Sequence, residues 1–252
     1  MNILTLGILL SGVFFALLTG CETERKESEI DKKKTITGVQ SVDPVKISPD
    51  IYRILVDNDY VRVIENRANP GQKDFMHSHP AGVWYTLKGA KLKLYTPDGM
   101  IRSVELKPGA VNFQDPIPMH AMENIGDKAM ELIIVELKDK KPAGTTGPDA
   151  VMVSPDIYRV MAENEKIRVL ELTLEPGAKD EPHGHPGSVF YVIRDSTGKI
   201  FTEGEEPKLL RLKAGNAWFQ EPVNQSRLEN TGETSIHMIL FEIKPGQEQI
   251  KK

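Results

Sequence analysis

Short runs of apolar and β-branched residues fill most of the first half of the chain, and turn residues divide them. No stretch shows the 3.6-residue period of a long amphipathic helix. The segments 97–99 (PDG) and 107–109 (KPG) are typical turns. This spacing predicts an all-β sandwich or barrel. The runs lie at 61–64, 73–79, 83–87, 91–95, 101–106, 110–114, 119–123 and 130–137.

The whole pattern occurs twice. The segment 48–53 (SPDIYR) recurs at 154–159, and this offset of 106 positions holds without a gap down the chain. A repeat of this length predicts two homologous domains. We place the first at residues 46–140 and the second at 151–247, joined by a Gly- and Pro-containing linker at 141–150.

The first 20 residues carry no charged side chain, and the segment Leu18-Thr19-Gly20-Cys21 closes the apolar run. This segment resembles a bacterial lipoprotein signal peptide, although the usual Lys or Arg before the apolar run is missing. The resemblance implies cleavage before Cys21, lipid attachment there, and a lipid-anchored place in the cell envelope, facing the periplasm or in the outer membrane of a two-membrane bacterium. The alternatives are a transmembrane anchor, for which the apolar run is short, and a secretory signal with a chance cysteine.

Residues 21–45 are charged and poor in apolar side chains, which predicts a flexible tether. A solvated helix is the alternative, but it lacks an apolar stripe. Cys21 is the one cysteine, so an intramolecular disulfide is excluded. The net charge is −4 with both signs interspersed, and no basic field indicates nucleic acid as a partner. The predicted lipid on Cys21 is the one contact with a membrane that we expect.

Histidines give the candidate chemistry. His77 and His79 lie two apart in a predicted strand, so their side chains share a face. His120 lies in a later turn-bounded run. Two surface histidines on an edge strand are the alternative reading of the pair.

Around these histidines the chain resembles the cupin superfamily. Pro70-Gly71 followed by His77-Ser78-His79 is similar to the first cupin motif, and Pro116, His120 and Asn124 are similar to the second. The resemblance covers both repeats, and small His-x-His-Pro cupins, including the type linked to β-alanine degradation, look most similar. It implies a bicupin: two tandem double-stranded β-helix (jelly-roll) barrels, with His77, His79 and His120 as metal ligands.

The fourth cupin ligand, a glutamate, is missing. Its position falls on Gly82, Val83 or Trp84, none of which is acidic. Three imidazoles with open positions suit Zn, Fe, Ni or Cu better than Mg or Ca. We therefore expect one mononuclear divalent metal, of undetermined identity, in the first domain.

The second repeat keeps His183 and His185, but Ser226 stands where the first has His120. Two imidazoles alone make a poor site unless Glu181, Gln225 or His237 contributes. We expect a degenerate copy that is kept for packing or for a metal-free ligand pocket.

Strand alternation places Val83, Tyr85 and Leu87 on one face, which we predict to line the barrel interior. For Tyr85 we favour a role in the core, with a contact to substrate as the alternative. Phe75 shares a face with His77 and would narrow the pocket.

Three functions stay open at this point. The first is a metal-dependent enzyme that acts on a small polar molecule, either dioxygenase-like or lyase- or isomerase-like. The second is a protein that binds a small molecule without turnover, and the third is a structural cupin. The catalytic residues are unknown, since no general base stands out. The oligomeric state is open too, and the repeat allows an intramolecular pseudo-dimer of the two cupins.

Overall fold

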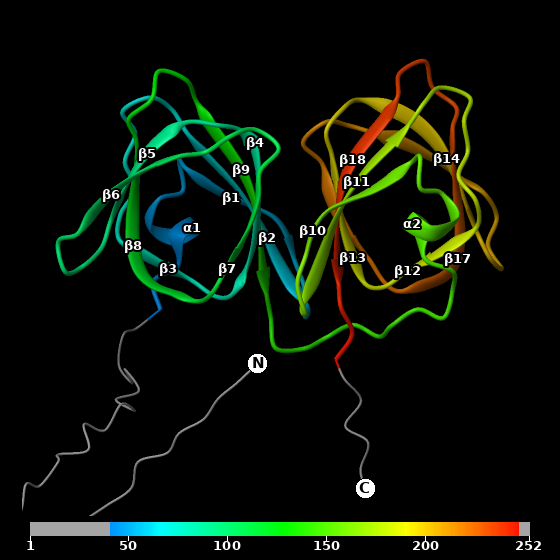
Figure 1. The fold of residues 1–252 in the computed structure, drawn as a ribbon, viewed down its shortest axis with the longest axis horizontal. Coiled ribbons are helices and arrows are strands. Elements are labelled where there is room, and N and C mark those ends of the chain that lie inside the picture. The colour runs from blue at the N-terminus through cyan, green and yellow to red at the C-terminus, as the bar shows by residue number, and fades with distance from the viewer. Residues whose placement is uncertain (1–40, 247–252) are drawn as a thin grey trace, which may run out of the picture. The chain divides into compact units, whose positions relative to one another are not determined.

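The computed structural model describes residues 41–246, and the predicted signal peptide, Cys21 and most of the predicted tether lie outside this range. The first repeat begins with one short helix and continues as strands (Figure 1). Its elements are α1 (Pro44–Ile47), β1 (Tyr52–Asp57), β2 (Val61–Ala68), β3 (His77–His79), β4 (Gly82–Lys88), β5 (Lys91–Tyr95), β6 (Ile101–Glu105), β7 (Val111–Gln114), β8 (Ile117–Asn124) and β9 (Met130–Leu137).

The second repeat has the same order of elements. They are α2 (Ala150–Val153), β10 (Tyr158–Glu163), β11 (Ile167–Leu174), β12 (His183–His185), β13 (Ser188–Val192), β14 (Ser196–Thr202), β15 (Lys208–Leu212), β16 (Ala217–Gln220), β17 (Val223–Asn230) and β18 (Ile236–Ile243). No helix in the part of the chain described here is long and apolar enough to cross a membrane.

Each repeat folds into two antiparallel sheets. In the first, the strand orders are β1-β2-β9-β4-β7 and β3-β8-β5-β6. In the second, β10-β11-β18-β13-β16 and β12-β17-β14-β15 repeat those orders strand for strand. Strands far apart in sequence lie side by side in both, as in a jelly roll. The fold is therefore all-β with two tandem jelly-roll units.

The segment ahead of the first barrel docks on that barrel. Asp43 caps α1 by accepting from the Val45 N–H, and its carboxylate also accepts from Arg62 at 2.9 Å. The Val42 N–H donates to the Ser78 hydroxyl beside β3. Residues 41–45, which the sequence assigns to the tether, therefore contact the first barrel, because Asp43 serves as both a helix cap and an ion-pair partner.

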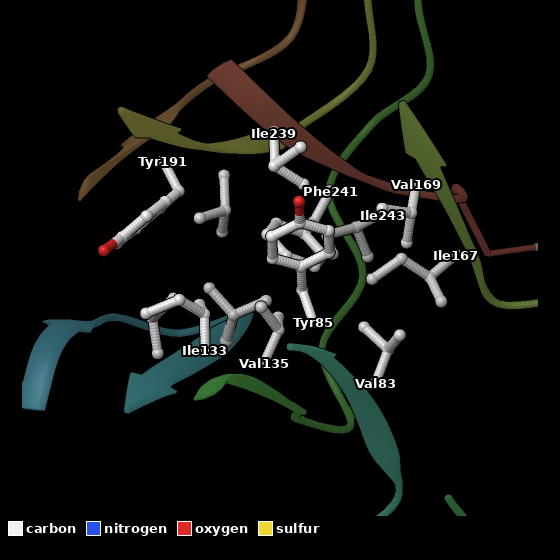
Figure 2. Packing of buried hydrophobic residues seen from close by; sticks show 13 residues of the cluster. Val83, Tyr85, Ile133, Val135, Ile167, Val169, Tyr191, Ile239, Phe241 and Ile243 are labelled. Carbon is white, nitrogen blue, oxygen red and sulfur yellow. The ribbon is translucent and has the colours of Figure 1, made fainter. Parts of the chain in front are cut away.

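Tyr85 shows that one expectation about the strand faces was wrong. Val83 and Tyr85 belong to a buried cluster that also contains Val169 and Phe241 of the second repeat, and Figure 2 shows these side chains facing one another. Trp84 packs instead on the interior cluster of the first barrel. Alternation identified which residues share a face, but the second repeat covers the face that the pattern assigned to the interior.

Phe75 also differs from expectation. Its side chain is 69% exposed, so it does not narrow the site. Phe75 lies outside β3, and its backbone N–H donates to the Ser48 hydroxyl. Strand alternation therefore does not extend from His77 to this residue.

Candidate metal centre

The three histidines meet through strand pairing. His77 and His79 lie on one face of β3, and His120 of β8 is the register partner of His77. Residues directly opposite in an antiparallel pair share a face, with Cβ atoms about 5 Å apart. The nitrogen ligand atoms of all three lie within 4.8 Å of one another. His77 is fully buried, His79 is 5% exposed, and His120 is partly exposed.

Hydrogen bonds fix the tautomers of the first two histidines. His77 Nδ1–H donates to the Phe75 carbonyl at 2.8 Å, and His79 Nδ1–H donates to Glu136 Oε1 at 2.7 Å. In each neutral ring the proton is thus on Nδ1, so Nε2 carries a lone pair. The two Nε2 atoms are 3.0 Å apart. Two lone pairs at this distance repel unless an electron-pair acceptor lies beside both.

Burial keeps the imidazoles of His77 and His120 neutral. Desolvation lowers the pKa of His77 to about 4, with a further lowering from the charge of His79. The pKa of His120 falls to about 3 for the same reason, and His77 and His79 add to the lowering. At neutral pH these two rings therefore present lone pairs, which is the state that a metal ion requires.

His120 supplies a further sign of fit. Its Nδ1 is buried and has no hydrogen-bond partner among residues 41–246. Its ring lies 4.3 Å from that of His77, centroid to centroid, and 5.4 Å from that of His79. An unpartnered buried nitrogen is costly in an apo protein. The donor set thus suits a transition-metal ion that prefers imidazole.

The missing glutamate ligand has a structural explanation. A Cβ at Gly82 would lie 2.3 Å from the Val135 carbonyl oxygen, so no side chain fits there. Val83 faces the cluster shared between the repeats, and Trp84 packs in the interior. The carboxylate beside the site comes instead from Glu136 of β9, which contacts His79 on the side away from its Nε2. Such outer partners orient a ligand and increase its basicity.

Tyr52 and Asp74 are site residues that the sequence argument missed. Tyr52 Oη donates to Asp74 Oδ2 at 2.6 Å and lies 3.3 Å from His77 Nε2. Burial raises the pKa of the Tyr52 hydroxyl well above its usual value and also raises that of Asp74. Both residues recur in the second repeat, as Tyr158 and Asp180. That recurrence was the signal available in the sequence.

The second repeat places its corresponding residues as the first repeat does. Ser226 is the register partner of His183, so it occupies the place of His120. Of the helpers considered from sequence, Glu181 contributes its carbonyl to His183 Nδ1–H, and its side chain is exposed. His237 Nε2 is 3.0 Å from Glu171 Oε1, away from the histidine pair. Gln225 is exposed.

Comparisons with known proteins agree on the fold. No protein-family model and no curated protein matches the chain. AerE from Microcystis aeruginosa aligns with 81% of this chain and 97% of its own length, with a TM-score of 0.59 and 16% identity. The oxalate decarboxylase of Lactobacillus farciminis, solved as a formate complex, aligns with 77% of this chain and 84% of its own, with a TM-score of 0.52 and 11% identity.

The oxalate decarboxylase of Bacillus subtilis, whose structure was described for its Mn(II) centres, covers 77% of this chain and 76% of its own, with a TM-score of 0.51 and 12% identity. At these identities the likeness shows the fold alone. It bears out the fold predicted from the sequence, which is two tandem jelly-roll barrels of the cupin type. The first barrel holds a group of three histidines that could bind a metal.

Proposed function

We propose that His77, His79 and His120 hold one mononuclear divalent metal ion in the first barrel, and that this centre acts on a small polar molecule. The observation that carries the proposal is the pair of converging Nε2 lone pairs, 3.0 Å apart, whose Nδ1 protons are already committed. The Mn(II) centres named for the Bacillus subtilis oxalate decarboxylase, a protein of similar fold, support it and add manganese to Zn, Fe, Ni and Cu as candidates.

An acid–base pair beside the centre favours an enzyme over a binding protein. A bound metal would polarise a substrate oxygen. Tyr52 Oη holds a proton 3.3 Å from His77 Nε2, and Asp74 accepts its hydrogen bond at 2.6 Å. When Asp74 is protonated, which the burial that raises its pKa favours, it donates to Tyr52 Oη instead, and the tyrosine proton is then free for a molecule at the open positions.

The interior of the first barrel is more polar than that of the second, which favours a polar molecule. Asn66 is 2% exposed, and its Oδ1 has no hydrogen-bond partner within the described part of the chain. Leu172 takes its place in the second repeat, and Trp218 takes that of Asn112. Asn66 Oδ1 is an acceptor for a substrate N–H or O–H, because a buried amide oxygen without a donor costs free energy.

A turnover screen tests the enzymatic reading. Full-length protein loaded with Fe(II), Mn(II) or Zn(II) is incubated with small carboxylates, keto acids, alcohols and amides, while oxygen uptake and product formation by NMR are followed. We expect turnover in the wild type and at least ~100-fold less in Tyr52→Phe at unchanged metal content, as removal of a general acid does. Binding of a small molecule with no turnover in either protein would favour the non-catalytic alternative, and neither binding nor turnover would favour a structural cupin.

We also propose that the protein is exported and held at the cell envelope by a lipid on Cys21. The apolar run before Leu18-Thr19-Gly20-Cys21 supports this. Intact mass measurement of the protein from membranes is the test. The expected result is a chain beginning at Cys21 with acyl chains attached, and Cys21→Ala should abolish both cleavage and acylation. An unmodified chain that keeps residues 1–20 would contradict it.

A further inference from the structure

The second barrel reproduces the histidine pair of the first. His183 Nε2 and His185 Nε2 are 2.8 Å apart, against 3.0 Å for the first pair. The ring centroids are 4.6 Å apart at an interplanar angle of 90°, against 4.8 Å and 89°. Both rings are buried, at 1% and 3% exposure.

The protons of this pair are committed in the same way. His183 Nδ1–H donates to the Glu181 carbonyl at 2.7 Å, and His185 Nδ1–H donates to Glu242 Oε1 at 2.9 Å. Arg168 Nε donates to the other oxygen of Glu242 at 2.6 Å, which orients that carboxylate. Both Nε2 lone pairs therefore face each other, and the group between them must accept electron pairs.

A cavity beside the pair limits what that group can be. Its volume is about 30 Å³, which is space for roughly two water molecules and no organic molecule. Apart from the two histidines, its polar lining comes from Tyr158, Asp180, Gln220 and Ser226. The remaining walls are apolar: Leu172, Phe190, Ile200, Leu210, Trp218, Leu228 and Met238.

A buried carboxyl group lies next to the cavity. Asp180 is 1% exposed, and both of its oxygens accept hydrogen bonds, from Tyr158 Oη at 2.7 Å and from the Leu228 N–H at 2.6 Å. Arg168, the nearby cation, is already paired with Glu242 and Asp149.

We propose that the second barrel is a second, weaker metal site, in which His183 and His185 bind one divalent transition-metal ion and Ser226 leaves open the position that His120 fills in the first. Imidazole nitrogen selects zinc-like ions over Mg or Ca. Each ligand of a four-ligand zinc site contributes on the order of 100-fold in affinity, so the second site should bind about 100-fold more weakly than the first.

Zn²⁺ titration of the metal-free full-length protein, in competition with a chromophoric chelator, tests the proposal. The wild type should bind one tight and one weak equivalent. Ser226→His adds the missing imidazole and should tighten the weak equivalent about 100-fold. His120→Ser gives the first barrel the ligand set of the second, and it should weaken the tight equivalent to the same degree.

The double variant His183→Ala/His185→Ala should lose the weak equivalent and keep the tight one. One equivalent in both the wild type and Ser226→His, with both proteins folded by circular dichroism, would overturn the proposal. So would ¹⁵N NMR evidence that a proton shared by the two Nε2 atoms persists at saturating Zn²⁺. Loss of the tight equivalent bears on the first barrel alone, so the two sites can fail separately.

Discussion

Glu136→Gln gives the sharpest prediction about how the first barrel prepares its ligands. The Glu136 carboxylate, 4% exposed, accepts the His79 Nδ1–H bond at 2.7 Å and thereby leaves the Nε2 lone pair free. Glutamine has the same shape but no charge. Its NH₂ group can also face Nδ1, which favours the tautomer with hydrogen on Nε2, and that tautomer cannot bind a metal.

The structure sets the expected size of the effect. Loss of an outer partner of a metal-binding histidine costs 10- to 100-fold in affinity, or about 1.4–2.8 kcal/mol. The free energy of unfolding should change by only ~1 kcal/mol, the value of one hydrogen bond. Arg62 loses a distant contact to Glu136 at 3.7 Å but keeps its 2.9 Å bond to Asp43.

Chelator competition with Zn²⁺ measures this change in affinity at the tight site. The repeat supplies the matched control, because Glu242 holds His185 in the second barrel at 2.9 Å. Glu242→Gln should leave the tight equivalent unchanged. A Glu136→Gln protein that folds and keeps wild-type affinity would refute the tautomer argument, and so would an equal loss of the tight equivalent in Glu242→Gln.

Three further predictions concern stability. Tyr52→Phe should lower the free energy of unfolding by about 1–3 kcal/mol in urea denaturation, because it removes the donor to the buried Asp74 Oδ2, and an unchanged midpoint would count against that bond. Phe241→Ala, at a fully buried position of the cluster that contains both repeats, should cost about 3–5 kcal/mol in the same assay, whereas a loss below ~1 kcal/mol would mean that the cluster contributes little. The free energy of unfolding of the metal-free protein should fall by about 3 kcal/mol between pH 7 and pH 4 through His77 alone. The pKa of His77 is about 4 in the folded protein and near 6.5 in the unfolded chain, so the unfolded chain takes up the proton first as the pH falls. The raised pKa of Asp74 offsets part of that loss, and urea midpoints in EDTA that stay constant over this range would contradict the assignment of buried neutral histidines.

The fold and the three histidines could be predicted from the sequence because both depend on short-range patterns. The alternation of strand residues puts His77 and His79 on one face, and the duplicated turn-bounded runs indicate two β-barrels. The resemblance to cupin motifs added His120, and strand pairing places it opposite His77.

The outer partners could not be predicted in the same way. Glu136 is 57 residues from His79 in the chain, and cross-strand register decides their contact. Tyr52 lies 25 residues before His77 and carries no local sign of their contact. Asp74 lies only three residues before His77, but it precedes the strand and its bond to Tyr52 is not visible in the sequence. Comparison of the repeats offered one route, because all three residues recur at the same offset as the histidines.

The face of β4 was misassigned for a different physical reason. Alternation separates Val83 and Tyr85 from Trp84, but both faces of this strand are buried. A pattern read within one repeat contains no information about the surface that the other repeat covers.

Metal content measured beside a matched pair of variants tests the central claim most directly. Full-length wild type, His120→Ala and Ser226→Ala are purified, dialysed against a weak chelator that strips weakly bound ions, and analysed by inductively coupled plasma mass spectrometry. We predict close to one equivalent of a transition metal in the wild type and in Ser226→Ala, and almost none in His120→Ala. Equal metal content in all three proteins, whether near one or near zero, would contradict the assignment of His77, His79 and His120 as the metal centre.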